Sequence, residues 1–298
     1  MDLGLALLER LDGDVVVSPY GLSRALATIR EGARGETRVA LEHIDAVPDV
    51  DGILSAQAVW LGEGYAPGPA LSALDTGPLD VERINAWSNE RTRGMIPRIL
   101  DSLDREEIFV LTDAEYLDAK WASPFEGTRR APFAGAGEVT MMHVEGTFEH
   151  AEDAIRLPYA DSELRFAAMM GEPPDEWSRG HGTVELPRFT TTSSLDLADT
   201  LVALGLGPAF RDGTDLDELI VGPGEKALQR ILQRARVDVD EEGTRAAATT
   251  AVTVRAVAFR PPSFRITFDR PFTWAVEHAP TGTPLFVGRV LNPTERSD

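Results

Sequence analysis

An α+β fold is expected, because helix-like patterns gather in the first third of the chain and strand-like patterns dominate the remainder. Apolar residues between 22 and 29 recur at the i, i+3, i+4, i+7 spacing of a half-buried helix. Toward the C-terminus, two apolar segments at 272–276 and 285–287 have the composition of strands. Neither a linker-like stretch nor an internal repeat divides the 298 residues, so a single domain spanning 1–298 is expected.

The first expected elements are a short strand and the helix that follows it directly. Residues 15–17 form a β-branched run, and Ser18 with Pro19 predicts the N-cap and first turn of a helix that ends at Gly32 and Gly35. The next expected elements are a short helix at 36–44, a strand at 54–61 stopped by a Gly/Pro cluster at 62–69, and an amphipathic helix from Ile84 to near Gly94.

Strands are expected to dominate the rest of the chain. The segment 108–121 is rich in apolar residues and has little helical capping, so it predicts a central strand. Another strand leads to 186–189, and a helix follows that Ser194 caps and Gly205 ends. The two C-terminal strands are joined by a turn at 279–282.

Charge and composition limit the partners of the protein. A net charge of −20 repels phosphate backbones and anionic lipids, so neither nucleic acid nor a membrane is an expected partner. The N-terminal residues lack the basic and apolar segments of a secretory signal, so a soluble, cytoplasmic protein is expected, with secretion left open if the N-terminus was trimmed. The absence of cysteine excludes disulfides, zinc-thiolate sites and thiol catalysis.

Signatures of enzymes and metal sites are missing from the sequence. It contains no G-x-S-x-G, H-E-x-x-H or P-loop motif, and its five histidines are scattered. The acidic run at 238–243 imitates the first half of a calcium loop, but Thr249 stands where the bidentate acid belongs. Neither catalytic activity nor a metal or cofactor is expected.

Three motifs are the most distinctive in the sequence: DEEGTRAAATT at 240–250, DRPF at 269–272 and GRVLNP at 288–293. They belong to a series of short motifs that runs in order along nearly the whole chain and resembles the serpin family of serine protease inhibitors. The other matching segments are 17–19, 32–37, 84–87, 92–96, 116–121, 124–125, 139–142, 157–159, 186–189, 204–206 and 209–210. The chain is identified on these motifs as a shortened serpin of the bacterial type.

The resemblance implies a serpin fold, in which helices surround a large, mostly antiparallel central sheet accompanied by two smaller sheets and an exposed reactive-centre loop. That loop would span about 243–262. The shortening is expected at two places: few residues separate Ile44 from Leu54, and a Gly/Pro-rich loop at about 171–183 replaces helices that the family commonly has.

The resemblance also implies a suicide mechanism in which the cleaved loop inserts as a new central strand and carries the trapped protease with it. The implied hinge residues are Glu241, Glu242, Gly243, Thr244, Ala246, Ala247, Ala248, Thr249 and Thr250. If Thr244 points inward, then every inward position from 244 to 254 is small or apolar, which suits a packed strand. Arg245 departs from the family's usual acid, at an outward position. An Ala-rich helix or plain loop remains the alternative.

The family's usual spacing from Gly243 places the reactive bond between Val257 and Ala258. A valine there favours an elastase-like or subtilisin-like serine protease, whereas Arg255 or Arg260 would imply a trypsin-like target. The alternative function is that of a non-inhibitory serpin-fold protein for binding or storage, which proteases would cleave as a plain substrate.

The resemblance further implies a latch that holds the central sheet shut, at Ser18, Gly21, Asp113 and Gln233, and places Trp121 at the breach where the loop enters. Three of the four latch residues differ from the family's usual serine, asparagine and histidine. We therefore expect a monomer that opens readily and converts on warming to a latent form or to loop-sheet polymers. Gly21→Ser is expected to slow this conversion if the site has room for the hydroxyl.

Overall fold

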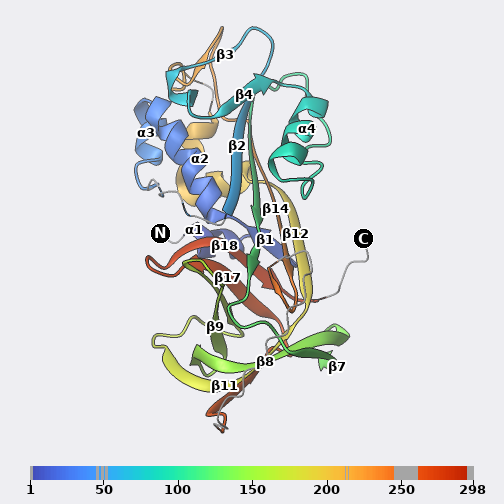
Figure 1. Cartoon of the computed structure of the whole chain (residues 1–298). Helices are drawn as coiled ribbons and strands as arrows, with labels where there is room; N and C mark the ends of the chain where they lie inside the picture. Colours follow the sequence, from blue (N-terminus) through green and yellow to red (C-terminus); the bar gives the residue numbers. More distant parts are fainter. Residues whose placement is uncertain are drawn as a thin grey trace.

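Two large sheets and a small set of helices make up the chain. The computed structural model describes residues 3–44, 47, 50, 53–211, 213, 215–244 and 261–293. In these ranges the helices gather around one end of the elongated molecule, and strands alone form the other end (Figure 1). The expected α+β class is confirmed.

The central sheet has seven strands. Six of them follow the order β4-β2-β5-β14-β15-β6, and β12 pairs with the other edge of β14. Their bounds are β2 Ile53–Leu61, β4 Asp75–Pro78, β5 Phe109–Leu117, β6 Ala119–Lys120, β12 Phe189–Asp196, β14 Arg230–Val239 and β15 Gly243–Thr244. All nine residues of β5 are buried. This confirms the central strand expected at 108–121.

The remaining strands form a nine-stranded sheet and a separate two-stranded ribbon. The nine strands are β1 Val15–Val17, β7 Gly127–Phe133, β8 Gly137–Ala151, β9 Ala154–Pro158, β10 Leu164–Met169, β11 Ser178–Pro187, β16 Phe264–Thr267, β17 Phe272–His278 and β18 Thr283–Val290. The ribbon pairs β3 Ala66–Pro67 with β13 Ile220–Val221. The resemblance implies two smaller sheets, but in this structure their strands form one continuous sheet, because β8 pairs with β7, β9 and β11.

Helices cover both faces of the upper central sheet (Figure 1). The side chains of α2 pack with Leu111 and Ile231 on one face, whereas Ile84 of α4 packs with Val110 and Leu232 on the other. Odd-numbered residues of β5 and β14 therefore face α2, and even-numbered residues face α4. The helices are α1 Leu3–Leu8, α2 Pro19–Gly32, α3 Gly35–Ala40, α4 Val81–Arg91 and α5 Ala198–Leu201, followed by a distorted π and 3-10 segment through Phe210.

Two expectations about local structure are wrong in detail. Ser194 does not cap a helix, because it lies within β12 opposite Arg234, and eight consecutive sheet pairings outweigh its preference for a cap. The helix begins only at Ala198, whose N–H donates to Asp196 Oδ1 at 3.2 Å. The Gly/Pro-rich loop expected at 171–183 is shorter, because β11 already begins at Ser178.

Candidate functional site at the centre of the sheet

The hinge segment enters the central sheet as the short strand β15. Gly243 and Thr244 lie between β14 and β6 and run antiparallel to both, with Thr244 opposite Val239 and also opposite Ala119. A tight turn precedes the strand, in which Asp240 Oδ1 accepts hydrogen bonds from the Glu242 and Gly243 amides at 2.9 and 3.1 Å. The chain therefore leaves β14, reverses direction and starts a new strand on the β5-facing edge of β14.

Only glycine fits at the start of this strand. A Cβ on Gly243 would lie 2.2 Å from the Ala119 carbonyl oxygen, far inside contact distance. The next side chain, Thr244, is fully buried, and its hydroxyl shares a 2.5 Å hydrogen bond with the Tyr159 hydroxyl. Burial raises the pKa of Tyr159 above its usual value, so this phenol stays neutral at physiological pH. Thr244 points inward, as the predicted alternation requires.

Trp121 and two charged residues hold the hinge turn in place. The Trp121 amide donates to Glu242 O and its indole Nε1 donates to Asp240 O, each at 2.9 Å. The indole also stacks on Tyr159, with ring centroids 4.7 Å apart. Glu241 forms an ion pair with Arg188 at 2.5 Å. Trp121, predicted to lie at the breach, is thus in direct contact with the predicted hinge.

Immediately past the hinge strand, β5 and β14 pair directly with each other. They run parallel, in a register that extends from Arg230 opposite Val110 to Arg236 opposite Tyr116. We call this line of contact the seam. A strand that continued β15 along the seam would run antiparallel to both neighbours, as β15 itself does. The sheet is therefore closed between β5 and β14, and Gly243 and Thr244 lie at the Tyr116–Arg236 end of the seam.

The four predicted latch residues meet at the middle of the seam. The Gln233 side chain accepts from the Ser18 amide at 2.7 Å, donates to Ser18 O at 2.9 Å and donates to Asp113 Oδ2 at 2.7 Å. Ser18 Oγ accepts from the Gly21 amide at 3.1 Å and donates to the Leu285 carbonyl. The longer amide of Gln233 thereby joins β14 to β5 across the seam and to the N-terminus of α2.

Sequence reasoning missed Glu115, which lies on β5 next to this group. Asp113 and Glu115 are both fully buried and face the first turn of α2. A Cβ on Gly21 would lie 2.1 Å from Glu115 Oε1 and 2.4 Å from Asp113 Oδ2. The condition attached to Gly21→Ser therefore fails, because two carboxyl groups already occupy the space for the side chain. The sequence did contain a signal for Glu115: it lies two residues after Asp113 in an apolar strand, so the two side chains must face the same side of the sheet.

Burial changes the titration of both carboxyl groups. It raises the pKa of Asp113 to about 6, although hydrogen bonds from Gln233 and Gln57 act in the opposite direction. Burial and the neighbouring Asp113 raise the pKa of Glu115 well above its usual value. The nearby Ser18 and Ser55 hydroxyls and the Arg24 guanidinium oppose this rise without cancelling it.

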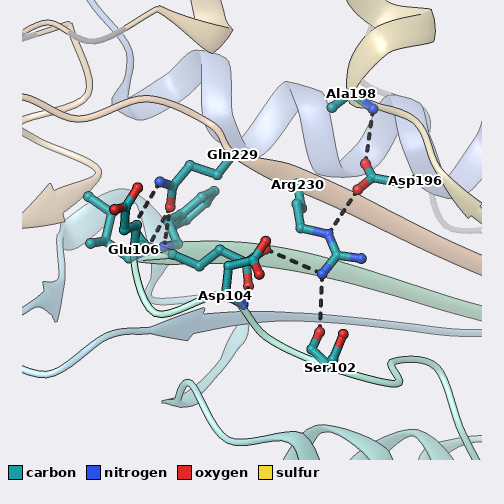
Figure 2. A network of polar contacts seen from close by, with 10 residues as sticks. Ser102, Asp104, Glu106, Asp196, Ala198, Gln229 and Arg230 are labelled. Atoms are coloured by element: carbon teal, nitrogen blue, oxygen red, sulfur yellow. Dashed lines mark hydrogen bonds and ion pairs between the residues drawn. The ribbon is translucent and has the colours of Figure 1, made fainter.

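A second set of polar contacts crosses the seam at its opposite end, near Val110 and Arg230 (Figure 2). Arg230 of β14 donates to Glu107 Oε1 and to Ser102 O, each at 3.3 Å, and to Asp196 Oδ2 of β12 at 2.8 Å. The neighbouring Gln229 Oε1 accepts from the amides of Ile108 and Phe109 at the start of β5. The segment leading into β5 is thus tied to β14 by side chains as well as by the sheet ladder.

The other predicted site residues fall outside the described residues. They are the hinge residues Ala246, Ala247, Ala248, Thr249 and Thr250, the reactive-bond residues Val257 and Ala258, and the alternates Arg255 and Arg260. In the part of the chain that is described, no three His, Cys, Asp or Glu side chains are grouped so that they could hold a metal ion. None of the described helices is long and apolar enough to cross a membrane.

Comparison with known families assigns the chain. A family model described as "Serpin (serine protease inhibitor)" matches residues 71–178 and 166–293. The chain belongs to the serpin family. Leukocyte elastase inhibitor of Bos taurus is 28% identical to this serpin, over 98% of this chain and 97% of the relative. A serpin-like protein of Thermococcus kodakarensis is also 28% identical, over 95% of this chain and 82% of the relative.

Solved serpin structures share the fold. Tengpin, a thermophilic serpin in its native state, superposes with a TM-score of 0.85 at 24% identity, over 98% of this chain and 92% of tengpin. Human thyroxine-binding globulin in complex with thyroxine also gives 0.85, at 21% identity, over 99% of this chain and 97% of the globulin. Both likenesses concern the fold, and the predicted serpin fold is confirmed.

Proposed function

We propose that this serpin is an irreversible inhibitor of serine endopeptidases that acts by inserting its cleaved loop into the seam. The observation that carries the proposal is the position of β15, whose Gly243 and Thr244 already form the first antiparallel pairs of an extra strand. Beyond them, toward Val110 and Arg230, the β5–β14 seam is closed, so a strand can still be added. The proposal treats 1–298 as one monomeric domain.

The covalent step requires no catalytic group from the serpin. The protease serine Oγ attacks the carbonyl carbon of Val257, an ester bond forms, and the Val257–Ala258 peptide bond breaks. The Ala258 nitrogen leaves as an amine with the proton taken from the serine. If the loop inserts before water hydrolyses the ester, the protease remains attached to the serpin.

The observed register supports an inserted strand of this sequence. Thr244 lies opposite both Ala119 and Val239, so a strand that kept this register would bring Thr250 between Asp113 and Gln233. Small inward residues would then replace the direct contact between β5 and β14 without overpacking. The Thr250 hydroxyl could also bond the polar groups that opening separates.

Valine at the reactive bond supports an elastase-like or subtilisin-like target, as its side chain fits a small apolar specificity pocket. Leukocyte elastase inhibitor, a relative of this chain, is named for a target of that class. Cleavage after Arg255 or Arg260 would instead indicate a trypsin-like target. The mass of the released C-terminal fragment shows which of these bonds the protease cuts.

The proposal is tested by incubating the protein with pancreatic elastase, subtilisin or trypsin and analysing the mixtures on a denaturing gel. We expect a heat-stable band at the summed mass of the serpin and one protease, and a fragment that begins at Ala258. Protease whose serine has been sulfonylated is the control and forms no such band. Cleavage at 257–258 without the high-mass band would disprove inhibition and support a substrate-like, non-inhibitory serpin.

A second candidate function is the binding of a small apolar molecule, as a non-inhibitory binding protein would do. A cavity of about 440 Å³ lies beside α1, β17 and β18, and its lining includes Leu5, Leu8, Ala275 and Val287. Cavities of this size suit drug-sized ligands. Calorimetric titration with apolar aromatic acids tests this candidate, and Ala275→Trp, which fills the cavity, should abolish any binding.

A further inference from the structure

The buried carboxyl pair Asp113 and Glu115 has an unequal supply of hydrogen-bond donors. Asp113 accepts from two amide groups, Gln233 Nε2 at 2.7 Å and Gln57 Nε2 at 3.2 Å. Neither oxygen of Glu115 has a hydrogen-bond partner among the described residues. Both side chains are 0% exposed. A buried carboxylate needs donors to remain charged, so Asp113 is suited to carry the negative charge and Glu115 to carry a proton.

The groups around the pair provide little positive charge. The first turn of α2 contributes Ser18 and Gly21, β2 contributes Ser55 and Gln57, and β14 contributes Gln233, all of them neutral. Arg24 of α2 is the one cation whose field reaches both carboxyl groups in the part of the chain that is described. One guanidinium can balance one carboxylate, and a second ionised carboxyl would be left uncompensated in a buried space.

A cavity of about 340 Å³ lies between α2, β2, β4 and α4, and its lining includes Arg24, Ser55 and Gln57. Ser55 is the register partner of Glu115, and Gln57 is the register partner of Asp113. The cavity therefore lies beside the β2 residues that pair with the two carboxyl groups, on the edge of β5 away from the seam. We expect protons to exchange with solvent on this side, without separation of β5 from β14.

We propose that Asp113 and Glu115 form a proton-dependent lock on the seam, which is shut while the pair holds one proton and is released as that proton is lost at rising pH. The proposal rests on the proposed function in one respect, because it assigns the regulation of the same sheet opening that loop insertion requires. Opening moves Gln233 away from Asp113 and admits water, so two separate charges are tolerated in the open sheet and not in the closed one.

The direction of the pH effect follows from the raised pKa values. In an open sheet both groups return toward their ordinary pKa values, so opening releases protons whenever the pH lies between the ordinary and the raised value. Asp113 contributes only up to about pH 6, where it is already ionised in the closed sheet. Above that pH, the dependence belongs to Glu115, and the closed sheet loses stability as the pH rises.

The test measures opening without any protease. Purified protein is warmed below its melting temperature at several pH values from 6 to 9, and conversion to latent or polymeric forms is followed on native gels. One released proton increases the opening equilibrium up to about tenfold per pH unit, so we expect the wild-type rate to rise at least about tenfold over this range. Glu115→Gln should reduce the rise to less than about twofold, since the amide cannot ionise.

Two controls make the result specific. Glu138→Gln makes the same side-chain exchange at an exposed position and should keep the wild-type pH dependence. The carbonyl band of a protonated carboxyl group in the infrared spectrum at pH 7 should be present in the wild type and reduced in Glu115→Gln. This spectrum reports the proton even if the variant opens too fast to be followed.

A Glu115→Gln variant with the pH dependence of the wild type, or a wild type whose opening does not depend on pH, would overturn the lock. Loss of the infrared difference between the two proteins would do the same. Failure of the proposed function has a different signature, because an absent covalent complex with protease at a fixed pH leaves all of these measurements unchanged.

Discussion

In the proposed mechanism insertion begins at Thr244, so its substitution tests that mechanism at the smallest scale. Thr244→Arg would place a guanidinium in the fully buried position now occupied by the threonine, beside Tyr159. An unpaired buried charge costs about 3–5 kcal/mol, so β15 should not dock and insertion should stall. We expect cleavage at the reactive bond to continue while the yield of covalent complex falls at least about tenfold, measured by densitometry of denaturing gels.

The matched control is Thr244→Val, which keeps the shape of the side chain and loses one hydrogen bond worth about 1 kcal/mol. It should retain most of the complex. An unchanged yield in Thr244→Arg would contradict the proposed register of the inserted strand.

Gly21 shows how the structure reverses an expectation drawn from sequence. A Cβ at this position would lie 2.1 Å from Glu115 Oε1. Overpacking of this kind costs about 1–3 kcal/mol, which exceeds the roughly 1 kcal/mol that a residue with a side chain gains over glycine in a helix. We therefore expect Gly21→Ser to accelerate opening of the seam, measured as faster loss of monomer on native gels during mild heating.

Gly21→Ala separates the two parts of the serine side chain, and it should open as fast because the Cβ causes the clash. Combining Gly21→Ala with Glu115→Ala removes the nearer of the two clashing carboxyl groups, so the double variant should recover more stability than the two single effects predict when added. Slower opening of Gly21→Ser than of the wild type would contradict this account.

At the residue scale, the structure gives the geometry of part of the predicted site, and the roles of its residues stay predictions. Thr244 is fully buried, and Ser18, Gly21, Asp113 and Gln233 lie together at the middle of the seam. The sequence reasoning missed Glu115, although Asp113 lies two residues earlier in β5 and therefore faces the same side of the sheet. The choice of face was fixed only by the register between β5 and α2, which no local pattern contains.

At the scale of elements, the contacts of Arg230 determine which parts must separate when the sheet opens. A strand inserted into the seam would move β14 away from β5 by about 5 Å, one strand spacing. Arg230 would then lose Glu107 and Ser102 and keep Asp196, because β12 moves together with β14. Arg230→Gln should accelerate spontaneous opening by about fivefold, since a partly exposed ion pair contributes about 1 kcal/mol.

Asp196→Asn is the matched control, because it weakens only the contact that moves with β14. Its opening rate on native gels should stay within about twofold of the wild type. If Arg230→Gln and Asp196→Asn change the rate equally, the contact with Glu107 does not restrain the seam.

Prediction of elements from the sequence was most accurate where one pattern had no competitor. The apolar run at 108–121 gave β5 and β6, and the capping signals at Ser18 and Pro19 gave the start of α2. Ser194 was misassigned because a serine is favoured both before a helix and at an exposed position of a strand. Its pairing with Arg234, forty residues later, decided the outcome.

At the scale of the whole molecule, the structure is held shut by contacts that insertion must replace. Gln233 crosses the middle of the seam, Arg230 crosses its Val110 end, and the hinge strand lies at its Tyr116 end. Insertion would extend the hinge strand, but it would first have to break the contacts that Gln233 and Arg230 make across the seam. The barrier to opening is therefore set at Gln233 and Arg230, and warming should convert intact monomer to latent or polymeric forms at a rate that these two sets control.

Cleavage of the loop removes the tether that keeps this barrier from being crossed, so cutting at 257–258 should stabilise the protein. The inserted strand would pair with β5 on one edge and β14 on the other. Each new hydrogen bond contributes about 1 kcal/mol, and each kcal/mol raises the melting temperature of a protein of this size by about 1.5 °C. We expect the cleaved wild type to melt at least about 10 °C above the intact protein in scanning calorimetry. Cleaved Thr244→Arg should show no such rise, because its strand cannot enter, and a cleaved wild type that melts at or below the intact temperature would exclude loop insertion.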